Sequence, residues 1–171
     1  MDQSDLLVEI FSRLPPLAHE AVDGLDASSL VSRPTDRANT IAWLVWHTAR
    51  VQDDHVADVM GTSQLWDETW AKRFSVDADL ENTGYGHGPA EVASVRPSSP
   101  DDLIAYLDAV HARTAGWLAT LTSQDLDRVV DERWDPPVTL GVRLVSVADD
   151  DIQHAGQAAY ARGLLDARAA G

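Results

Sequence analysis

The chain has 171 residues, 44% of them hydrophobic and 24% charged, a composition typical of folded globular proteins and unlike that of disordered chains. It contains no cysteine, which excludes disulfides, cysteine zinc ligands and a cysteine nucleophile. Twenty-eight acidic residues against thirteen basic ones give a formal net charge of −15, which disfavours nucleic acid and anionic membranes as partners. Acidic first residues and the lack of a membrane-spanning apolar run predict a cytoplasmic protein.

Helical periodicity begins near the N-terminus, where apolar residues recur three and four positions apart over residues 6–24. Pro15 and Pro16 interrupt this pattern, so it predicts either two short helices or one kinked helix. Residues 28–36 are rich in serine, proline and aspartate, which favours a turn-rich connection.

The clearest helix is expected over residues 40–60. Thr40 offers an N-cap and Gly61 a C-terminal stop. One buried stripe is expected on it, with His47 and His55 close by. The stripe consists of Ile41, Leu44, Val45, Thr48, Val51 and Val59.

No long helical period survives over residues 61–98, although Trp66, Trp70 and Phe74 indicate short helical turns. Residues 81–89, ENTGYGHGP, form a glycine-rich loop. Loops this long inside a compact domain are typical of functional or mobile segments.

Two further long helices are expected in the second half. Ser99 followed by a proline and two aspartates predicts the start of a helix that carries apolar residues to position 121. Residues 127–141 read as irregular, and a last helix is expected from about 140 to 163. Four main helices with one long crossover predict an all-α helical bundle, and the lack of repeats or linkers predicts a single domain over residues 1–171.

Among the six histidines, His47 is unusual because large apolar side chains surround it in the middle of its helix. A buried histidine needs a partner for each ring nitrogen or a metal on one of them. Both a hydrogen-bonded core histidine and a metal ligand are consistent with this pattern.

The last helix contains VADDDIQHAGQ, in which three aspartates precede His154. At about 100° per residue, Asp150 lies about 40° from His154, Asp151 about 60° the other way, and Asp149 about 140° away. A solvated acidic face is one reading. The other is a site in which His47, Asp150 and His154 bind one cation, with Asp151 hydrogen-bonded behind them.

Four blocks of this sequence resemble the DinB-like superfamily, and more narrowly its mycothiol-dependent branch of mycothiol S-transferases and isomerase metal domains. The blocks are NTIAWLVWHTARVQDDHVADV, TGYGHGP, ERWDPPVTLGVRLVSV and DDIQHAGQAAYARG. The resemblance implies a DinB-like four-helix bundle with up-down-down-up topology. It also implies one divalent metal, zinc above all, held by a histidine on the second helix and by two residues one turn apart on the last. His47, Asp150 and His154 match those positions.

The implied function is a metal-dependent thiol S-transferase in which mycothiol, as a metal-bound thiolate, attacks a small electrophile. The partners are therefore a small-molecule thiol and an electrophile, and a homodimer is one candidate for the assembly. Hydrogen-bonding residues are expected to meet the sugar–cyclitol head group of mycothiol, and an aromatic residue to line the electrophile pocket. These candidates are Arg50, Asn82, Tyr85, His87, Gln157 and Trp46.

Two other functions stay open at this point. The site could hydrolyse or dehalogenate a small molecule with metal-activated water and no thiol. Alternatively, the domain could bind metal without catalysis, as a storage or stress-response protein. Binding of mycothiol would support the S-transferase, whereas indifference to mycothiol would favour the hydrolase.

Overall fold

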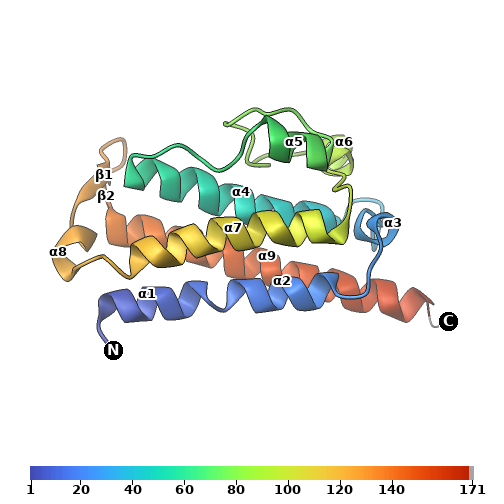
Figure 1. Cartoon of the computed structure of the whole chain (residues 1–171), viewed down its shortest axis with the longest axis horizontal. Coiled ribbons are helices and arrows are strands. Elements are labelled where there is room, and N and C mark those ends of the chain that lie inside the picture. Colours follow the sequence, from blue (N-terminus) through green and yellow to red (C-terminus); the bar gives the residue numbers. More distant parts are fainter. Residues whose placement is uncertain (170–171) are drawn as a thin grey trace.

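The computed structural model describes residues 1–169, so residues 170 and 171 of the expected domain lie outside the described part. Its long helices lie side by side and form a four-helix bundle (Figure 1). The first arm of the bundle is split into two helices, and the other three arms are continuous. These helices are α1 (Gln3–Phe11), α2 (Leu14–Val22), α4 (Ile41–Met60), α7 (Pro100–Leu118) and α9 (Leu140–Ala169).

Short elements connect the long helices. A one-turn helix, α3, precedes α4, two short helices lie in the crossover between α4 and α7, and a one-turn helix and a two-stranded antiparallel hairpin precede α9. These elements are α3 (Ala27–Leu30), α5 (Glu68–Phe74), α6 (Pro89–Ser94), α8 (Ser123–Leu126), β1 (Val129–Asp131) and β2 (Val138–Thr139).

The helix ends follow the capping residues in the sequence. The Thr40 hydroxyl accepts a hydrogen bond from the Trp43 amide at 3.1 Å, and Gly61 ends α4 with a φ of 68°. Ser99 caps α7 in the same way as Thr40 caps α4. Pro15 lies in the first turn of α2, where a missing amide hydrogen costs no helical bond, and this explains why the first arm is two helices.

The arms run up, down, down and up. The colour gradient shows that α4 and α7 run in the same direction, while α2 and α9 run in the opposite one (Figure 1). Because α4 is about 30 Å long at 1.5 Å per residue, the chain must return that distance before α7 can begin parallel to it. This return is the long crossover that holds α5 and α6, and it covers α4.

Helix α4 is the central element. It packs against α9 and α7, and every residue from Ile41 to Asp53 is buried. The sequence predicted one buried stripe on this helix, but the crossover buries the remaining face as well. Among the described residues, no helix is long and apolar enough to cross a membrane.

Two predicted helix ends differ from the structure. Helix α7 ends at Leu118, three residues before the expected end, and α9 continues past Gly163 to Ala169. Glycine weakens a helix by only about 1 kcal/mol, and beyond it Leu165 packs on the core and Arg168 donates a hydrogen bond to the Arg33 carbonyl. These contacts explain why α9 does not stop at the glycine.

Candidate metal centre

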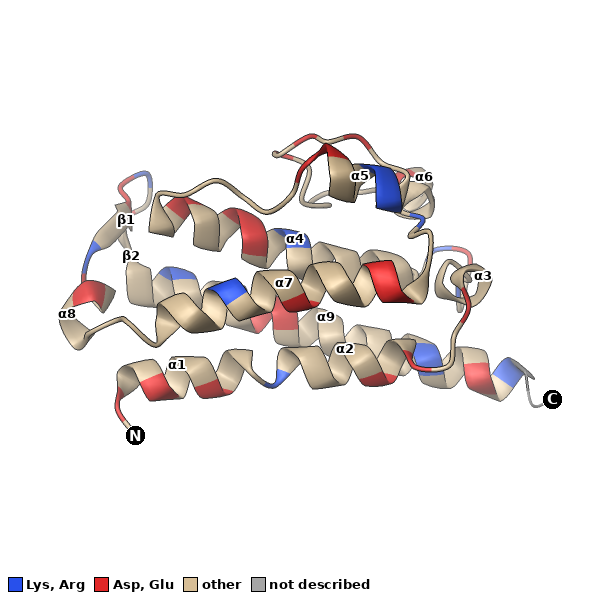
Figure 2. Ribbon diagram, in the orientation of Figure 1, with Lys and Arg blue, Asp and Glu red and all other residues tan. Residues whose placement is uncertain are grey.

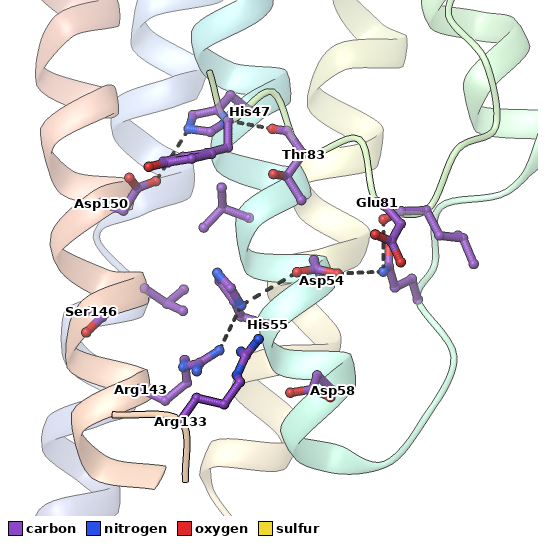
Figure 3. A pocket seen from close by; sticks show the side chains of 15 residues that line it. His47, Asp54, His55, Asp58, Glu81, Thr83, Arg133, Arg143, Ser146 and Asp150 are labelled. Atoms are coloured by element: carbon purple, nitrogen blue, oxygen red, sulfur yellow. Dashed lines mark hydrogen bonds and ion pairs between the residues drawn. The ribbon is translucent and has the colours of Figure 1, made fainter. Parts of the chain in front are cut away.

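Three side chains from two helices converge on one point. His47 comes from α4, while Asp150 and His154 lie one turn apart on α9, and one ligand atom from each lies within 4.8 Å of the others. His47 Nε2 is 3.7 Å from Asp150 Oδ2, and His47 is only 5% exposed (Figure 3). The structure thus brings together the three residues that the sequence predicted as ligands.

The backbone of the crossover orients His47. Its Nδ1 lies 2.5 Å from the Thr83 carbonyl oxygen, and a carbonyl can only accept, so Nδ1 carries the proton. Nε2 of the neutral ring then presents a lone pair toward Asp150. The Trp43 ring stacks on the imidazole at 4.6 Å with an interplanar angle of 12°, which fixes the plane of the ring.

His154 is oriented by its own helix. Its Nδ1 donates to the carbonyl of Asp150 at 2.8 Å, which leaves its Nε2 as the atom with a free lone pair. The two imidazole rings lie 4.6 Å apart at an angle of 70°. Both histidines therefore have the tautomer that a metal ligand needs, with the second nitrogen held by a carbonyl.

Asp150 supplies the observation that tests whether a cation fits. Its Oδ2 is buried and has no hydrogen-bond partner among the described residues. A buried carboxylate oxygen without a donor is costly unless a cation neutralises it. Two imidazole nitrogens and one carboxylate oxygen form a donor set that suits zinc and leaves a coordination position free. The residues present therefore fit a divalent metal.

The surroundings shift the pKa values of the three groups in different directions. Burial, aided by the charge of His154, lowers the pKa of His47 although the Thr83 carbonyl opposes this, so its ring is kept neutral. Burial also acts to lower the pKa of His154, but the carboxylate of Asp150 at 3.5 Å and its carbonyl outweigh that effect, so the pKa is raised. Burial acts to raise the pKa of Asp150, and the two imidazoles outweigh it, so the pKa is lowered.

Gly84 allows the crossover to lie directly on the site. It has a φ of +94°, and a Cβ atom there would be 2.9 Å from His47 Nδ1 and 2.9 Å from the Trp46 ring. The Asn82 side chain accepts a hydrogen bond from the Gly84 amide at 3.2 Å and stabilises this turn. No residue other than glycine fits here without displacing the histidine or the loop.

A pocket of about 840 Å³ opens beside the centre and is lined by His47 and Asp150 at one end. Most of its polar lining was not predicted from the sequence. These residues are Asp54, His55 and Asp58 of α4, Arg143 and Ser146 of α9, Arg133 of the hairpin that precedes α9, and Gln64, Glu81 and Thr83 of the crossover (Figure 3).

One comparison with known proteins identifies the family. The family model described as mycothiol-S-transferase matches residues 7–167, nearly the whole chain. The chain belongs to the mycothiol-S-transferase family. No curated protein matches it.

Several solved structures are similar to this family member. The crystal structure of a conserved protein of locus from Enterococcus faecalis is 32% identical, with a TM-score of 0.89 over 98% of this chain and 99% of that one. YfiT from Bacillus subtilis, described as a probable metal-dependent hydrolase with an unusual four-helix bundle topology, is 18% identical. Its TM-score is 0.60 over 98% of this chain and 88% of that one, and this likeness shows the shared fold.

Arg50 of this mycothiol-S-transferase family member is fully buried rather than exposed to a ligand. Its guanidinium donates to the carbonyls of Leu80 and Asn82 at 2.8 and 3.2 Å and lies 3.5 Å from the Asp53 carboxylate. The side chain therefore fastens the crossover to α4. It has no exposed atom with which to bind the head group that the sequence analysis assigned to it.

Two other candidates are also fully buried. Trp46 packs in the core against Trp66, with no exposed surface for an electrophile. Both carboxylate oxygens of Asp151 are buried without a hydrogen-bond partner among the described residues, so the structure does not show the expected bond to a ligand. Burial, together with the charge of Asp150, raises the pKa of Asp151 well above its usual value. The helical angle predicted that Asp151 lies beside the site, but its side chain is buried inside the bundle.

The remaining candidates are spread over two regions. Tyr85 is 94% exposed and lines the 840 Å³ pocket. His87 lies outside that lining, beside Trp43 and Trp46, and its Nδ1 accepts a hydrogen bond from the Trp43 indole at 3.0 Å. Gln157 lines a different hollow of about 460 Å³, formed with residues 34–39. Of the predicted ligand-binding residues, Tyr85 therefore shares a pocket with the metal centre and Gln157 does not.

Proposed function

We propose that this protein is a metal-dependent mycothiol S-transferase that joins mycothiol to a small electrophile. The observation that carries the proposal is the convergence of two imidazole lone pairs and one buried carboxylate oxygen, which has no hydrogen-bond donor within residues 1–169, at the end of a pocket. Membership of the mycothiol-S-transferase family supports the choice of thiol. The proposal places the protein in the cytoplasm, where low-molecular-weight thiols stay reduced.

His47, Asp150 and His154 would hold the cation, which we expect to be zinc because of the donor set. A bound divalent cation would supply the positive charge that lowers the pKa of a thiol, ordinarily about 8.5, toward neutrality. The Thr83 carbonyl keeps His47 in the ligating tautomer, and Asp150 places a negative charge beside the nucleophile. That charge offsets part of the cation's charge, so the sulfur keeps its nucleophilicity.

The chain itself supplies no thiol, since it contains no cysteine. The sulfur that forms the new bond therefore arrives with the cosubstrate. In the reaction the thiol sulfur forms a bond to an electrophilic carbon of the second substrate, and the thiol proton passes to solvent. The electron pair of the broken carbon bond departs with the leaving group, or, in an addition, the neighbouring atom of the electrophile takes up a proton.

The test measures metal content and conjugation on the purified protein. We expect about one zinc per chain and turnover of monochlorobimane with mycothiol that is lost on chelation and restored by zinc. Glutathione should support far less turnover because its head group differs. Equal rates with both thiols, or no turnover with mycothiol over a broad panel of electrophiles, would overturn the proposal.

A thiol-free assay of the same purified protein tests the hydrolase alternative, which the description of YfiT suggests. A hydrolase would need only metal-activated water, so metal-dependent loss of an ester or halide substrate without any thiol would favour it. We expect no such reaction in thiol-free buffer.

A further inference from the structure

The 840 Å³ pocket extends well beyond the metal centre, along the groove between α4 and α9. On α4 its lining runs from His47 to Asp58, which is about 16 Å of helical rise, and on α9 it runs from Asp150 to Arg143, about 10 Å. The two ends of the pocket are thus about two helical turns apart along α9 and about three along α4. In Figure 3, His47 and Asp150 lie in the upper part of the view, and His55, Asp58 and Arg143 lie in the lower part. A ligand that fills the pocket must be elongated.

The end away from the metal centre is built of connected polar side chains. Arg143 Nη1 donates to His55 Nδ1 at 3.1 Å, so His55 accepts with that nitrogen and keeps its other nitrogen as a donor. His55 Nδ1 also lies 3.6 Å from the Asp54 carboxylate. Burial, although the acids nearby oppose it, lowers the pKa of His55, so the ring stays neutral. Donors and acceptors therefore alternate over this end.

The hairpin holds the arginines in place. The Asp131 carboxylate accepts hydrogen bonds from Arg133 Nε and Nη2, both at 2.9 Å, and from Arg143 Nη2 at 3.3 Å. These hydrogen bonds, with the charges of the arginines, keep the pKa of Asp131 far below its usual range. Because Asp131 is ionised, the largely buried Arg143 has a fixed partner and a fixed direction at the pocket wall. The exposed Arg133 pairs with the same carboxylate.

The charge of the lining narrows the ligand class. Four carboxylates and two guanidiniums line the pocket, and a divalent cation at the metal centre would balance the remaining two negative charges. A strongly anionic head group would meet the carboxylates of Asp54, Asp58 and Glu81 at unfavourable cost. An uncharged polyhydroxylated group can instead donate to these carboxylates and accept from His55 and Arg143.

We propose that Asp54, His55, Asp58 and Arg143 form a subsite for the uncharged sugar–cyclitol head group of the thiol cosubstrate, about two to three helical turns from the proposed metal centre. This inference rests on the proposed function for the identity of the thiol. It replaces the assignment of the head group to Arg50 and Gln157, which the structure places in the core and in another hollow. The thiol arm then lies along Val51 and Val147, the apolar middle of the pocket.

The first test compares two thiols on one variant. Asp58 is exposed at the pocket and its carboxylate makes no hydrogen bond or ion pair within residues 1–169, so Asp58→Ala is expected to fold. N-acetylcysteine carries the thiol without the head group and is the reference substrate. We expect the ratio of kcat/KM for mycothiol over N-acetylcysteine to fall about tenfold in Asp58→Ala, the effect of one lost hydrogen bond to a charged group.

Asp77→Ala is the matched control, because Asp77 is an exposed aspartate of the crossover outside the pocket, and its ratio should equal that of the wild type. Asp54→Ala gives a second reading on the same subsite. An unchanged ratio in both Asp54→Ala and Asp58→Ala would overturn the subsite. Zinc content is measured in every variant, so that metal loss is not mistaken for loss of head-group binding.

A binding experiment separates failure of the subsite from failure of the proposed function. The sugar–cyclitol head group alone, without its cysteine, is titrated into zinc-loaded protein by calorimetry. We expect binding to the wild type and about tenfold weaker binding to Asp58→Ala. No binding to the wild type would overturn the subsite even if mycothiol is conjugated, whereas binding without any conjugation would overturn only the transferase activity.

Discussion

At the scale of single residues, the proposed metal centre depends on two carbonyl groups that each occupy one nitrogen of a histidine. The Thr83 carbonyl comes from the crossover and the Asp150 carbonyl from the preceding turn of α9. Both leave Nε2 free and pointing away from the backbone. The sequence could predict that His47, Asp150 and His154 share a site, because the four-residue spacing puts the last two on one face of a helix. It could not predict the role of Thr83, because every residue type has a backbone carbonyl.

Substitution of the aspartates tests the rotation of α9. Asp150 faces His47, whereas Asp149 is exposed and its carboxylate accepts a hydrogen bond from Gln153 at 2.8 Å. Asp150→Ala should weaken zinc binding by more than the roughly 10–100-fold typical of losing an outer partner of a ligand. Asp149→Ala should bind zinc as the wild type does. Competition with a chromogenic chelator measures both, and the opposite order of effects would mean that α9 is rotated relative to the structure.

Two glycines in the same loop separate backbone strain from steric contact. Gly84 and Gly86 both have positive φ angles, +94° and +76°, but a Cβ atom would meet His47 and Trp46 only at Gly84. Gly86→Ala should cost about 1–2 kcal/mol of unfolding free energy from the left-handed conformation. Gly84→Ala should cost about 1–3 kcal/mol more, because of overpacking, and should also weaken zinc binding.

Urea unfolding and zinc competition on the two variants provide the measurement. If Gly84→Ala and Gly86→Ala lose equal stability and both keep wild-type zinc affinity, the loop does not press on His47.

At the scale of elements, α4 acts as the support of both the core and the crossover. Its capping residues and length were predicted from the sequence, because Thr40 and Gly61 are local signals. The fastening of the crossover was not predicted. Arg50 lies three residues before Asp53 and four after Trp46, on the face of α4 opposite the predicted apolar stripe. An acid three residues away and a large apolar side chain four residues away are together the signal for a buried ion pair. The prediction that Arg50 binds a ligand did not take Asp53 and Trp46 into account.

Removal of the Arg50 charge should therefore be a structural change. Arg50→Met leaves Asp53 buried without one of its partners and frees the carbonyls of Leu80 and Asn82. Breaking a buried pair typically costs about 3–5 kcal/mol, and we expect that loss in unfolding free energy. The matched control is Arg13→Met, which breaks an exposed pair with Glu9 and should cost less than about 1 kcal/mol. Equal losses in urea unfolding would show that Arg50 does not fasten the crossover.

At the scale of the whole molecule, the metal centre joins two arms that each run the length of the bundle. The up-down-down-up order makes α4 and α9 antiparallel neighbours, with His47 opposite Asp150 and His55 opposite Arg143. The helices themselves could be predicted from periodicity. The pocket lining could not, since it depends on which turn of α4 faces which turn of α9, and helix packing tolerates several such registers.

Because the centre exists only when α4 and α9 are packed together, metal binding should stabilise the entire fold. A ligand that binds only the native state at 100 times its Kd adds about 2.7 kcal/mol, which raises Tm by about 5–10 °C for a chain of this length. Calorimetry with and without zinc measures the shift. His154→Ala should remove it, because that variant lacks one of the three ligands.

The net charge of −15 makes a second control necessary. Acidic side chains are spread over α1, α2, α4, α7, α9 and the crossover, while basic ones are few (Figure 2). Any divalent cation relieves their mutual repulsion and so raises Tm without a specific site. Magnesium at the same concentration should therefore stabilise the wild type and His154→Ala by the same small amount. Zinc should add its larger shift only to the wild type, and an equal zinc shift in both proteins would mean that it binds the acidic surface rather than the site of His47, Asp150 and His154.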